Sequence, residues 1–366
     1  MALTAGIVGL PNVGKSTLFN AITHSQVEAA NYPFATIDPN VGVVEVPDNR
    51  VEELVKIFNP KKTIYTTFEF TDIAGLVRGA SKGEGLGNKF LANIRETDAI
   101  CEVVRCFENS DITHVDGNVD PIRDIETINI ELVFADLDTV EKRIGKIEKK
   151  AQTGDKDSKF ELEILLAIKE TLEKEKPIRS MEFTKEEMAI VSQFCFLTQK
   201  PLIYVANLSE DEIGNPEGNE HFLKVKEYAA NEGCQVVPIC AQIESELAGL
   251  DEEDRLMFME DLGIEESGLD KLIKAAYRLL GLKTFFTVGA DEVRAWTFKN
   301  GMTAPEMAGI IHTDFQKGFI RAETYSYDDL MVYKTELACR EAGKIRQEGK
   351  AYVGQDGDIM FFKFNV

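Results

Sequence analysis

The stretch Gly9–Ser16 reads Gly-Leu-Pro-Asn-Val-Gly-Lys-Ser, a complete G-x-x-x-x-G-K-[ST] phosphate-binding loop. Its glycines let the backbone curl so that N–H groups point toward an anion, and the lysine adds positive charge for the terminal phosphates. The serine hydroxyl is suited to Mg²⁺, and we also expect the lysine to act in catalysis. The residues expected to contact a nucleoside triphosphate here are Asn12, Val13, Gly14, Lys15, Ser16 and Thr17.

A phosphate-loop protein needs a second carboxylate near the metal and a group that senses the γ-phosphate. Asp72-Ile73-Ala74-Gly75 supplies both at the end of a predicted strand: Asp72 can reach the metal, and the Gly75 N–H can meet the γ-phosphate. Thr36, in a loop-like stretch upstream, is the candidate that completes the Mg²⁺ shell. The predicted metal ligands are therefore Ser16, Thr36 and Asp72.

Base recognition is expected at Asn207-Leu208-Ser209-Glu210, which follows the predicted strand Leu202–Ala206. Guanine-binding proteins of this kind use N-K-x-D, whose Asp accepts hydrogen bonds from the guanine N1–H and amino group. Here Leu208 replaces the basic residue, and Glu210 has a carboxylate one methylene farther out. Asn207 can still pair with an adenine edge, so the altered motif favours ATP; a GTPase that tolerates these changes is the alternative.

The residue after D-x-x-G is Leu76, where many related enzymes place a glutamine that orients the attacking water. We therefore expect slow intrinsic hydrolysis unless another group takes that role. His114 lies in a polar loop after a predicted strand, and imidazole gains and loses a proton near neutral pH. His114 is thus a candidate catalytic residue, although a loop histidine is more often inert.

These residues require a parallel α/β sheet with a phosphate loop at one strand end. Apolar runs predict strands, and helix-like stretches at 222–231 and 269–280 are expected to cover the sheet. The predicted strands are Ala5–Gly9, Gly42–Val46, Thr67–Asp72, Ala99–Phe107, Leu202–Ala206 and Val236–Ile239. We assign the nucleotide-binding domain to residues 1–125 and 200–281.

Residues 126–199 form a predicted insertion with a helical period of its own. Apolar residues at 133, 137, 140, 144, 147 and 151 follow alternating spacings of four and three, which places one seam along a helix. A polar break at 153–157 precedes a second apolar helix. This pattern predicts an antiparallel coiled-coil hairpin, whose outer face is either a partner-binding arm or plain solvated surface. Thr184 and Glu187 match a capping box.

From residue 282 onward, short alternating runs predict a compact α+β domain at 282–366. Its strands are expected at Thr284–Val288, Glu292–Phe298, Phe319–Thr324 and Ile359–Phe364, around one helical stretch at Ala304–Ile311. We find no catalytic cluster in this region.

The composition is that of an ordinary globular protein, with 44% hydrophobic and 28% charged residues. A net charge of −22 argues against generic nucleic-acid binding. The acidic excess is greatest at 208–270, where a solvated surface is the favoured interpretation. No apolar stretch is long enough for a membrane span, and the six cysteines show no metal or disulfide spacing. We expect a cytoplasmic monomer that does not contact a membrane.

The motifs also resemble a known family. The phosphate loop, Asn31-Tyr32-Pro33-Phe34-Ala35-Thr36-Ile37 and the run from Asp72 to Gly87 resemble the signatures of the Obg-related translation-factor GTPases. The helical insertion and the end of the chain narrow the resemblance to the YchF-type branch, the Obg-like ATPases. It implies a P-loop nucleotide domain, a coiled-coil arm and a carboxy-terminal β-grasp module of the TGS type.

The resemblance further implies ATP preference, a role for His114, and work on the ribosome in translation or stress response. It leaves open which ribosomal subunit is bound and whether RNA is contacted through the coiled coil or the TGS-type module. Asn12 resembles a residue with which related GTPases bind K⁺, so K⁺ joins Mg²⁺ as a candidate cation; otherwise Asn12 only shapes the loop. A nucleotide-stabilised ribosome-binding scaffold without regulated hydrolysis is the remaining alternative.

Overall fold

A computed structural model describes residues 3–25, 40–73, 86–112, 114 and 117–365 of the 366-residue chain. The chain forms two compact units. The first unit comprises Met1–Val43 and Glu69–Ala276, and the second unit comprises Val44–Phe68 and Tyr277–Val366.

The core of the first unit is a sheet in the order β2-β4-β1-β5-β6-β7. The pairs β1–β4, β1–β5, β5–β6 and β6–β7 are all parallel. Every residue of β5 and β6 is buried, as expected for strands covered on both faces. The strands are Thr4–Val8 (β1), Val41–Glu45 (β2), Thr67–Asp72 (β4), Ala99–Arg105 (β5), Leu202–Asn207 (β6) and Gln235–Ile239 (β7).

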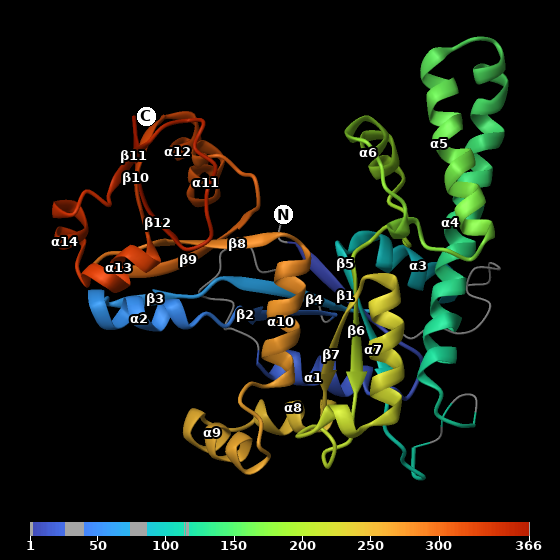
Figure 1. Cartoon of the computed structure of the whole chain (residues 1–366), viewed down its shortest axis with the longest axis horizontal. Coiled ribbons are helices and arrows are strands. Elements are labelled where there is room, and N and C mark those ends of the chain that lie inside the picture. Colours follow the sequence, from blue (N-terminus) through green and yellow to red (C-terminus); the bar gives the residue numbers. More distant parts are fainter. Residues whose placement is uncertain (1–2, 26–39, 74–85, 113, 115–116, 366) are drawn as a thin grey trace. The chain divides into compact units, whose positions relative to one another are not determined.

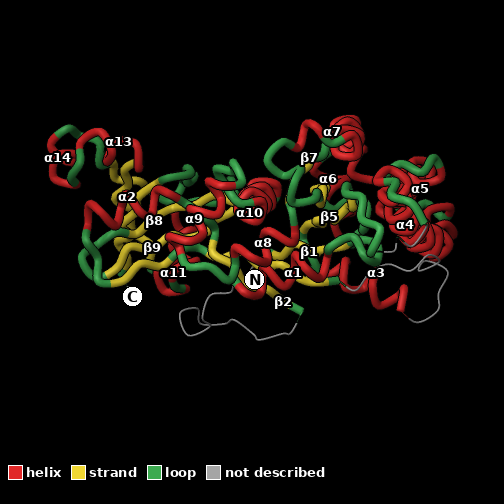
Figure 2. The backbone as a smooth tube through the Cα atoms, turned by 90° about the horizontal axis from the view of Figure 1, so that it is seen from below, coloured by secondary structure: helices red, strands yellow, loops and turns green. Residues whose placement is uncertain are grey.

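Helices cover this sheet, and Figure 2 shows α1 and α7 on opposite sides of its strands. Each predicted helix in this unit is present, and the helices α3, α8 and α9 are additional to the prediction. The helices are Lys15–His24 (α1), Leu86–Glu96 (α3), Glu220–Glu232 (α7), Ala241–Leu247 (α8), Glu252–Asp261 (α9) and Gly268–Leu279 (α10).

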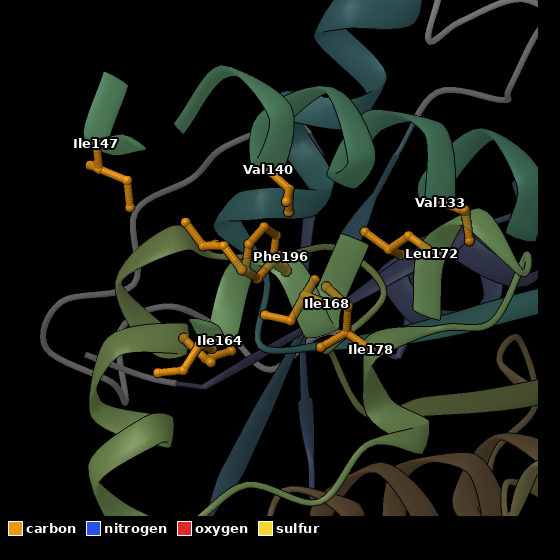
Figure 3. Close-up of a cluster of buried hydrophobic side chains, with 10 residues drawn as sticks. Val133, Val140, Ile147, Ile164, Ile168, Leu172, Ile178 and Phe196 are labelled. Atoms are coloured by element: carbon orange, nitrogen blue, oxygen red, sulfur yellow. The ribbon is translucent and has the colours of Figure 1, made fainter. Parts of the chain in front are cut away.

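The predicted hairpin is formed by α4 (Pro121–Gln152) and α5 (Lys156–Glu173), which lie side by side (Figure 1). Asp120 caps α4 and Pro121 occupies its first turn, so the helix starts before the predicted boundary at residue 126. Figure 3 shows the seam between the helices, where Val133, Val140 and Ile147 of α4 face Ile164, Ile168 and Leu172 of α5. The predicted seam is therefore confirmed.

The chain returns from the hairpin through a 3₁₀ turn at Ile178–Ser180, then α6 (Lys185–Val191) and a second 3₁₀ turn at Ser192–Phe194. The predicted capping box is present, since Thr184 accepts a hydrogen bond from the Glu187 N–H and Glu187 accepts one from the Thr184 N–H. Ile178 and Phe196 join the buried seam of the hairpin (Figure 3).

The second unit has a sheet in the order β11-β10-β12-β8-β9-β3. The pairs β8–β9, β10–β12 and β10–β11 are antiparallel, whereas β12–β8 and β3–β9 are parallel. The strands are Lys62–Ile64 (β3), Leu282–Thr287 (β8), Glu292–Lys299 (β9), Phe319–Ser326 (β10), Arg346–Glu348 (β11) and Asp358–Phe364 (β12). The helices are Asn49–Phe58 (α2), Ala304–Ile311 (α11), Thr313–Lys317 (α12), Tyr327–Tyr333 (α13) and Glu336–Glu341 (α14).

Two sequence-based expectations differ from this architecture. Residues 44–68, placed in the nucleotide domain by their order in the chain, group with the second unit, because Val51 and Leu54 of α2 pack with Phe286 and Val293. One helical stretch was expected after residue 282, and the structure has α12, α13 and α14 in addition to it. These helices are too short for a periodic apolar pattern and are defined by caps, such as Ser326 for α13 and Thr335 for α14.

Among the described helices, none combines the length and the apolar composition that a bilayer crossing requires.

Candidate nucleotide-binding site

The phosphate loop runs from the end of β1 into the first turn of α1, which begins at Lys15, as the motif predicts. Its backbone turns through two left-handed residues, Asn12 at φ 64° and Gly14 at φ 97°. A side chain at Gly14 would also collide with the Asn207 amide, and one at Gly9 would come within 2.8 Å of the Val103 carbonyl oxygen. Both glycines are therefore required by close packing of the loop.

A cavity of about 890 Å³ opens beside this loop, within the size range of small-molecule sites. It is built from the phosphate loop and from the loops that follow β5, β6 and β7, so it lies at the carboxyl ends of parallel strands. Of the predicted residues, it is lined by Asn12, Gly14, Lys15, Ser16, Thr17, Asn207, Leu208 and Glu210. Val13 is buried, and its backbone carbonyl accepts a hydrogen bond from the Asn207 side chain.

Lys15 and Asp72 form an ion pair, with Nζ 2.7 Å from Oδ1. Their side chains are 10% and 24% exposed, so the pair is partly shielded from water. Asp72 is held at the end of β4 by its N–H, which donates to the Asn40 carbonyl. The pair brings Asp72, the carboxylate predicted to support the metal, next to the phosphate-loop lysine. Bound phosphates would compete with Asp72 for the ammonium group of Lys15.

Asn207 connects the separate segments that form the cavity. Its Nδ2 donates to the Val13 carbonyl at 2.8 Å, and its Oδ1 accepts from the Ala241 N–H at 2.9 Å. The side chain is only 3% exposed. That Asn207 receives the base stays a prediction, and the structure shows another role for this side chain: its amide holds the phosphate loop against β6 and the start of α8.

The residues after Asn207 have different surroundings. Leu208 is buried at the cavity wall, and its N–H donates to the Ile239 carbonyl. Glu210 is exposed at the cavity rim. The carboxylate that shapes this loop is instead Glu212, which accepts hydrogen bonds from Ser209 and Asn219.

Burial opposes ionisation of Glu212, but these hydrogen bonds outweigh it and hold the pKa of the carboxyl below its usual value. Sequence reasoning missed this residue. The three-residue spacing from Ser209 to Glu212 was the available signal.

His114 does not line this cavity within the part of the chain that the structure describes. It is buried, and its Nε2 lies 2.8 Å from Oδ2 of Asp124 in the first turn of α4. It lines a separate cavity together with Arg105 and the loop after β5. Neither Asp124 nor Arg105 was singled out from the sequence, because no local motif marks them.

Thr36, Gly75 and Leu76 lie outside the described residues. The described residues contain no group of three or more His, Cys, Asp or Glu side chains that could hold a metal. Ser16 and Asp72 nevertheless offer hard oxygen donors beside the phosphate loop. That donor set fits Mg²⁺, which is commonly held by one or two protein groups together with substrate phosphates.

Comparisons with known proteins agree with this arrangement. Residues 4–136 match a family model described as "50S ribosome-binding GTPase". Residues 282–365 match the YchF-GTPase carboxy-terminal model, described as "Protein of unknown function (DUF933)".

Similar proteins cover the whole chain. The Ribosome-binding ATPase YchF of Bacillus subtilis is 64% identical over 366 residues, covering 100% of both chains. The protein of the same name from Escherichia coli O157:H7 is 56% identical over the same length and coverage. The structure of the Schizosaccharomyces pombe YchF GTPase matches with a TM-score of 0.90 and 42% identity, covering 99% of this chain and 97% of that one. This chain therefore belongs to the YchF family of P-loop nucleotide hydrolases.

Proposed function

We propose that this protein is a Mg²⁺-dependent hydrolase of ATP that binds ATP in preference to GTP and acts on the ribosome. Leu208 carries the preference for ATP. It is an apolar residue buried at the cavity wall where a guanine-reading loop has a basic residue, and the exposed Glu210 has a side chain one methylene longer than the aspartate of N-K-x-D.

The phosphates would lie against the phosphate loop and the amino-terminal turn of α1, whose N–H groups and helix dipole favour an anion. Lys15 would leave Asp72 for the phosphates and stabilise the charge that develops during hydrolysis. Ser16, Thr36 and Asp72 would hold Mg²⁺, and the Gly75 N–H would meet the γ-phosphate. When bound, Mg²⁺ neutralises charge on the phosphate oxygens. His114 would position the attacking water.

Replacement of K⁺ by Na⁺ tests the role of Asn12, whose left-handed backbone places it at the rim of the same cavity. A lower hydrolysis rate in Na⁺ is expected if Asn12 binds K⁺, and an equal rate excludes that role.

His114→Ala should retain ATP affinity and lose turnover, and unchanged turnover excludes a catalytic part for His114.

The relatives named ribosome-binding ATPases support a ribosomal partner, and the net charge of −22 favours specific docking over generic attraction to RNA. We infer a cytoplasmic monomer that meets the ribosome through the hairpin or through the second unit, whose fold we assign to the TGS-type β-grasp class. Cosedimentation with separated ribosomal subunits tests this and identifies the subunit bound.

Nucleotide choice is tested by competition binding of ATP against GTP to the wild type and to Leu208→Lys/Glu210→Asp, which rebuilds N-K-x-D. We expect the wild type to favour ATP. The double variant should shift the GTP-to-ATP affinity ratio toward GTP by about tenfold, the effect of about 1.4 kcal/mol of charge-assisted hydrogen bonding. Glu210→Gln alone is the matched control. Wild-type GTP binding that is tenfold tighter than ATP binding refutes the proposal.

A further inference from the structure

Helix α4 serves two parts of the first unit. From Val133 onward it forms the seam of the hairpin with α5, whereas its first turn carries Asp124, the partner of His114. At 32 residues the helix is about 48 Å long from one end to the other. One continuous helix thus joins the arm to the candidate catalytic histidine.

The His114–Asp124 contact is a buried one. The two side chains are 2% and 4% exposed, and Nε2 lies 2.8 Å from Oδ2. The other carboxylate oxygen of Asp124 accepts hydrogen bonds from Arg123, which also donates to the side chain and backbone of Asn118. Asp124 is therefore fixed between its own helix and the loop that leads into it.

The loop that precedes His114 separates two cavities. Glu108, Asn109 and Ile112 line both the nucleotide cavity and the separate cavity that contains His114. Arg105 holds this loop by donating to the carbonyls of Phe107, Asn109 and Ile112. His114 follows Ile112 by only two residues, so the histidine lies close in the chain to a residue that lines both cavities.

Helix α4 is also fastened farther along, at Asp136. This buried carboxylate accepts hydrogen bonds from the Leu197 N–H and from the N–H and hydroxyl of Thr198, which belong to the segment returning to β6. Burial raises the pKa of Asp136, and these hydrogen bonds oppose the increase. The Asp136 attachment lies between Asp124 and the tip of the arm. A helix pushed at its tip would pivot about this attachment.

We propose that Asp124 is a positioning residue that ties His114 to α4, so that a partner bound to the arm changes the position of His114 relative to the nucleotide. The inference rests on the proposed function, in which His114 positions water and a ribosome is the partner. It adds the route by which that partner reaches the histidine.

The test is the rate at which diethyl pyrocarbonate modifies each of the chain's four histidines, followed by mass spectrometry of the full chain. His24 and His312 are exposed and serve as internal references. In the wild type, His114 should be the slowest to react. Asp124→Asn keeps the shape of the side chain but removes its charge, and should raise His114 modification about fivefold, as expected when a charge-assisted hydrogen bond becomes a neutral one.

Asp120→Asn is the matched control, because it removes the same charge from the same helix end and asparagine caps a helix as well as aspartate. It should leave His114 protected. Equal modification rates of His114 in wild type and Asp124→Asn would show that Asp124 does not hold His114 against α4, and would overturn the proposal. A melting temperature close to that of the wild type confirms that the variant is folded.

If Asp124→Asn does not fold, the wild type alone decides the question. Ribosomes added with a non-hydrolysable ATP analogue should raise His114 modification relative to His24, and an unchanged or lower rate overturns the coupling. Failure of the proposed function is seen separately, as absence of ribosome cosedimentation or as unchanged turnover of His114→Ala.

Discussion

Asn207→Ala offers the sharpest test of how the nucleotide cavity is assembled. The substitution removes two buried hydrogen bonds, to the Val13 carbonyl and from the Ala241 N–H, and leaves both backbone groups without their side-chain partner. At about 1–2 kcal/mol for each bond, including the cost of the abandoned buried group, the first unit should lose about 2–4 kcal/mol of unfolding free energy.

The same change should weaken ATP binding, because the phosphate loop loses its attachment to β6. If the loop must then be ordered by the ligand at a cost of about 1.4 kcal/mol, the dissociation constant rises about tenfold. Urea unfolding with and without ATP measures the stability, since the transition that ATP shifts belongs to the nucleotide-binding unit. Titration calorimetry measures the affinity.

Thr198→Ala is the matched control. Thr198 is likewise buried, its hydroxyl accepts from the Ile178 N–H and donates to Asp136, and it does not line the nucleotide cavity. It should cost a similar free energy of unfolding and leave ATP affinity within about twofold of wild type. If both variants weaken ATP binding equally, the loss reflects general destabilisation and the attachment argument for Asn207 is wrong.

Three further outcomes are expected. Lys15→Ala should abolish the ATP binding that calorimetry detects and leave the circular dichroism spectrum unchanged, because the Lys15 ammonium group supplies positive charge where the phosphates would lie; retained affinity would contradict this. Glu102, buried in β5 with no hydrogen-bond partner among the described residues, has its pKa raised by burial, so folding stability should fall as pH rises above the usual carboxyl range; Glu102→Gln should reduce the difference in unfolding free energy between pH 5 and pH 8, measured with urea. Glu212→Gln should loosen the base-binding loop and raise the dissociation constant for ATP several-fold, with Glu217→Gln, an exposed carboxylate nearby in the chain, as the unaffected control.

The parts that sequence reasoning predicted correctly are those with a short-range physical signal. The phosphate loop requires glycine, lysine and serine at set spacings, and the structure places the glycines between β1 and α1 and the lysine and serine in the first turn of α1. The arm was predictable because apolar residues at 133, 140 and 147 repeat with the period of a helix seam, and the Thr184–Glu187 capping box is a contact within one turn.

Other features depend on contacts between distant residues and carry no local pattern. Residues 44–68 follow the phosphate loop in the chain, yet α2 packs with Phe286 and Val293, more than 200 positions later. The short helices α12, α13 and α14 are stabilised by caps and by tertiary packing, so no apolar period in the sequence predicts them.

The sequence by itself determined that this protein binds phosphates and which local elements surround the loop, because those properties follow from residue types at fixed short spacings. Only the tertiary structure decided that Asn207 holds the phosphate loop in place, that Asp72 pairs with Lys15, and that His114 is buried against Asp124 of the arm helix. Each of these contacts joins residues from separate elements, and the folding of the sheet and of α4 is what brings them within hydrogen-bonding distance.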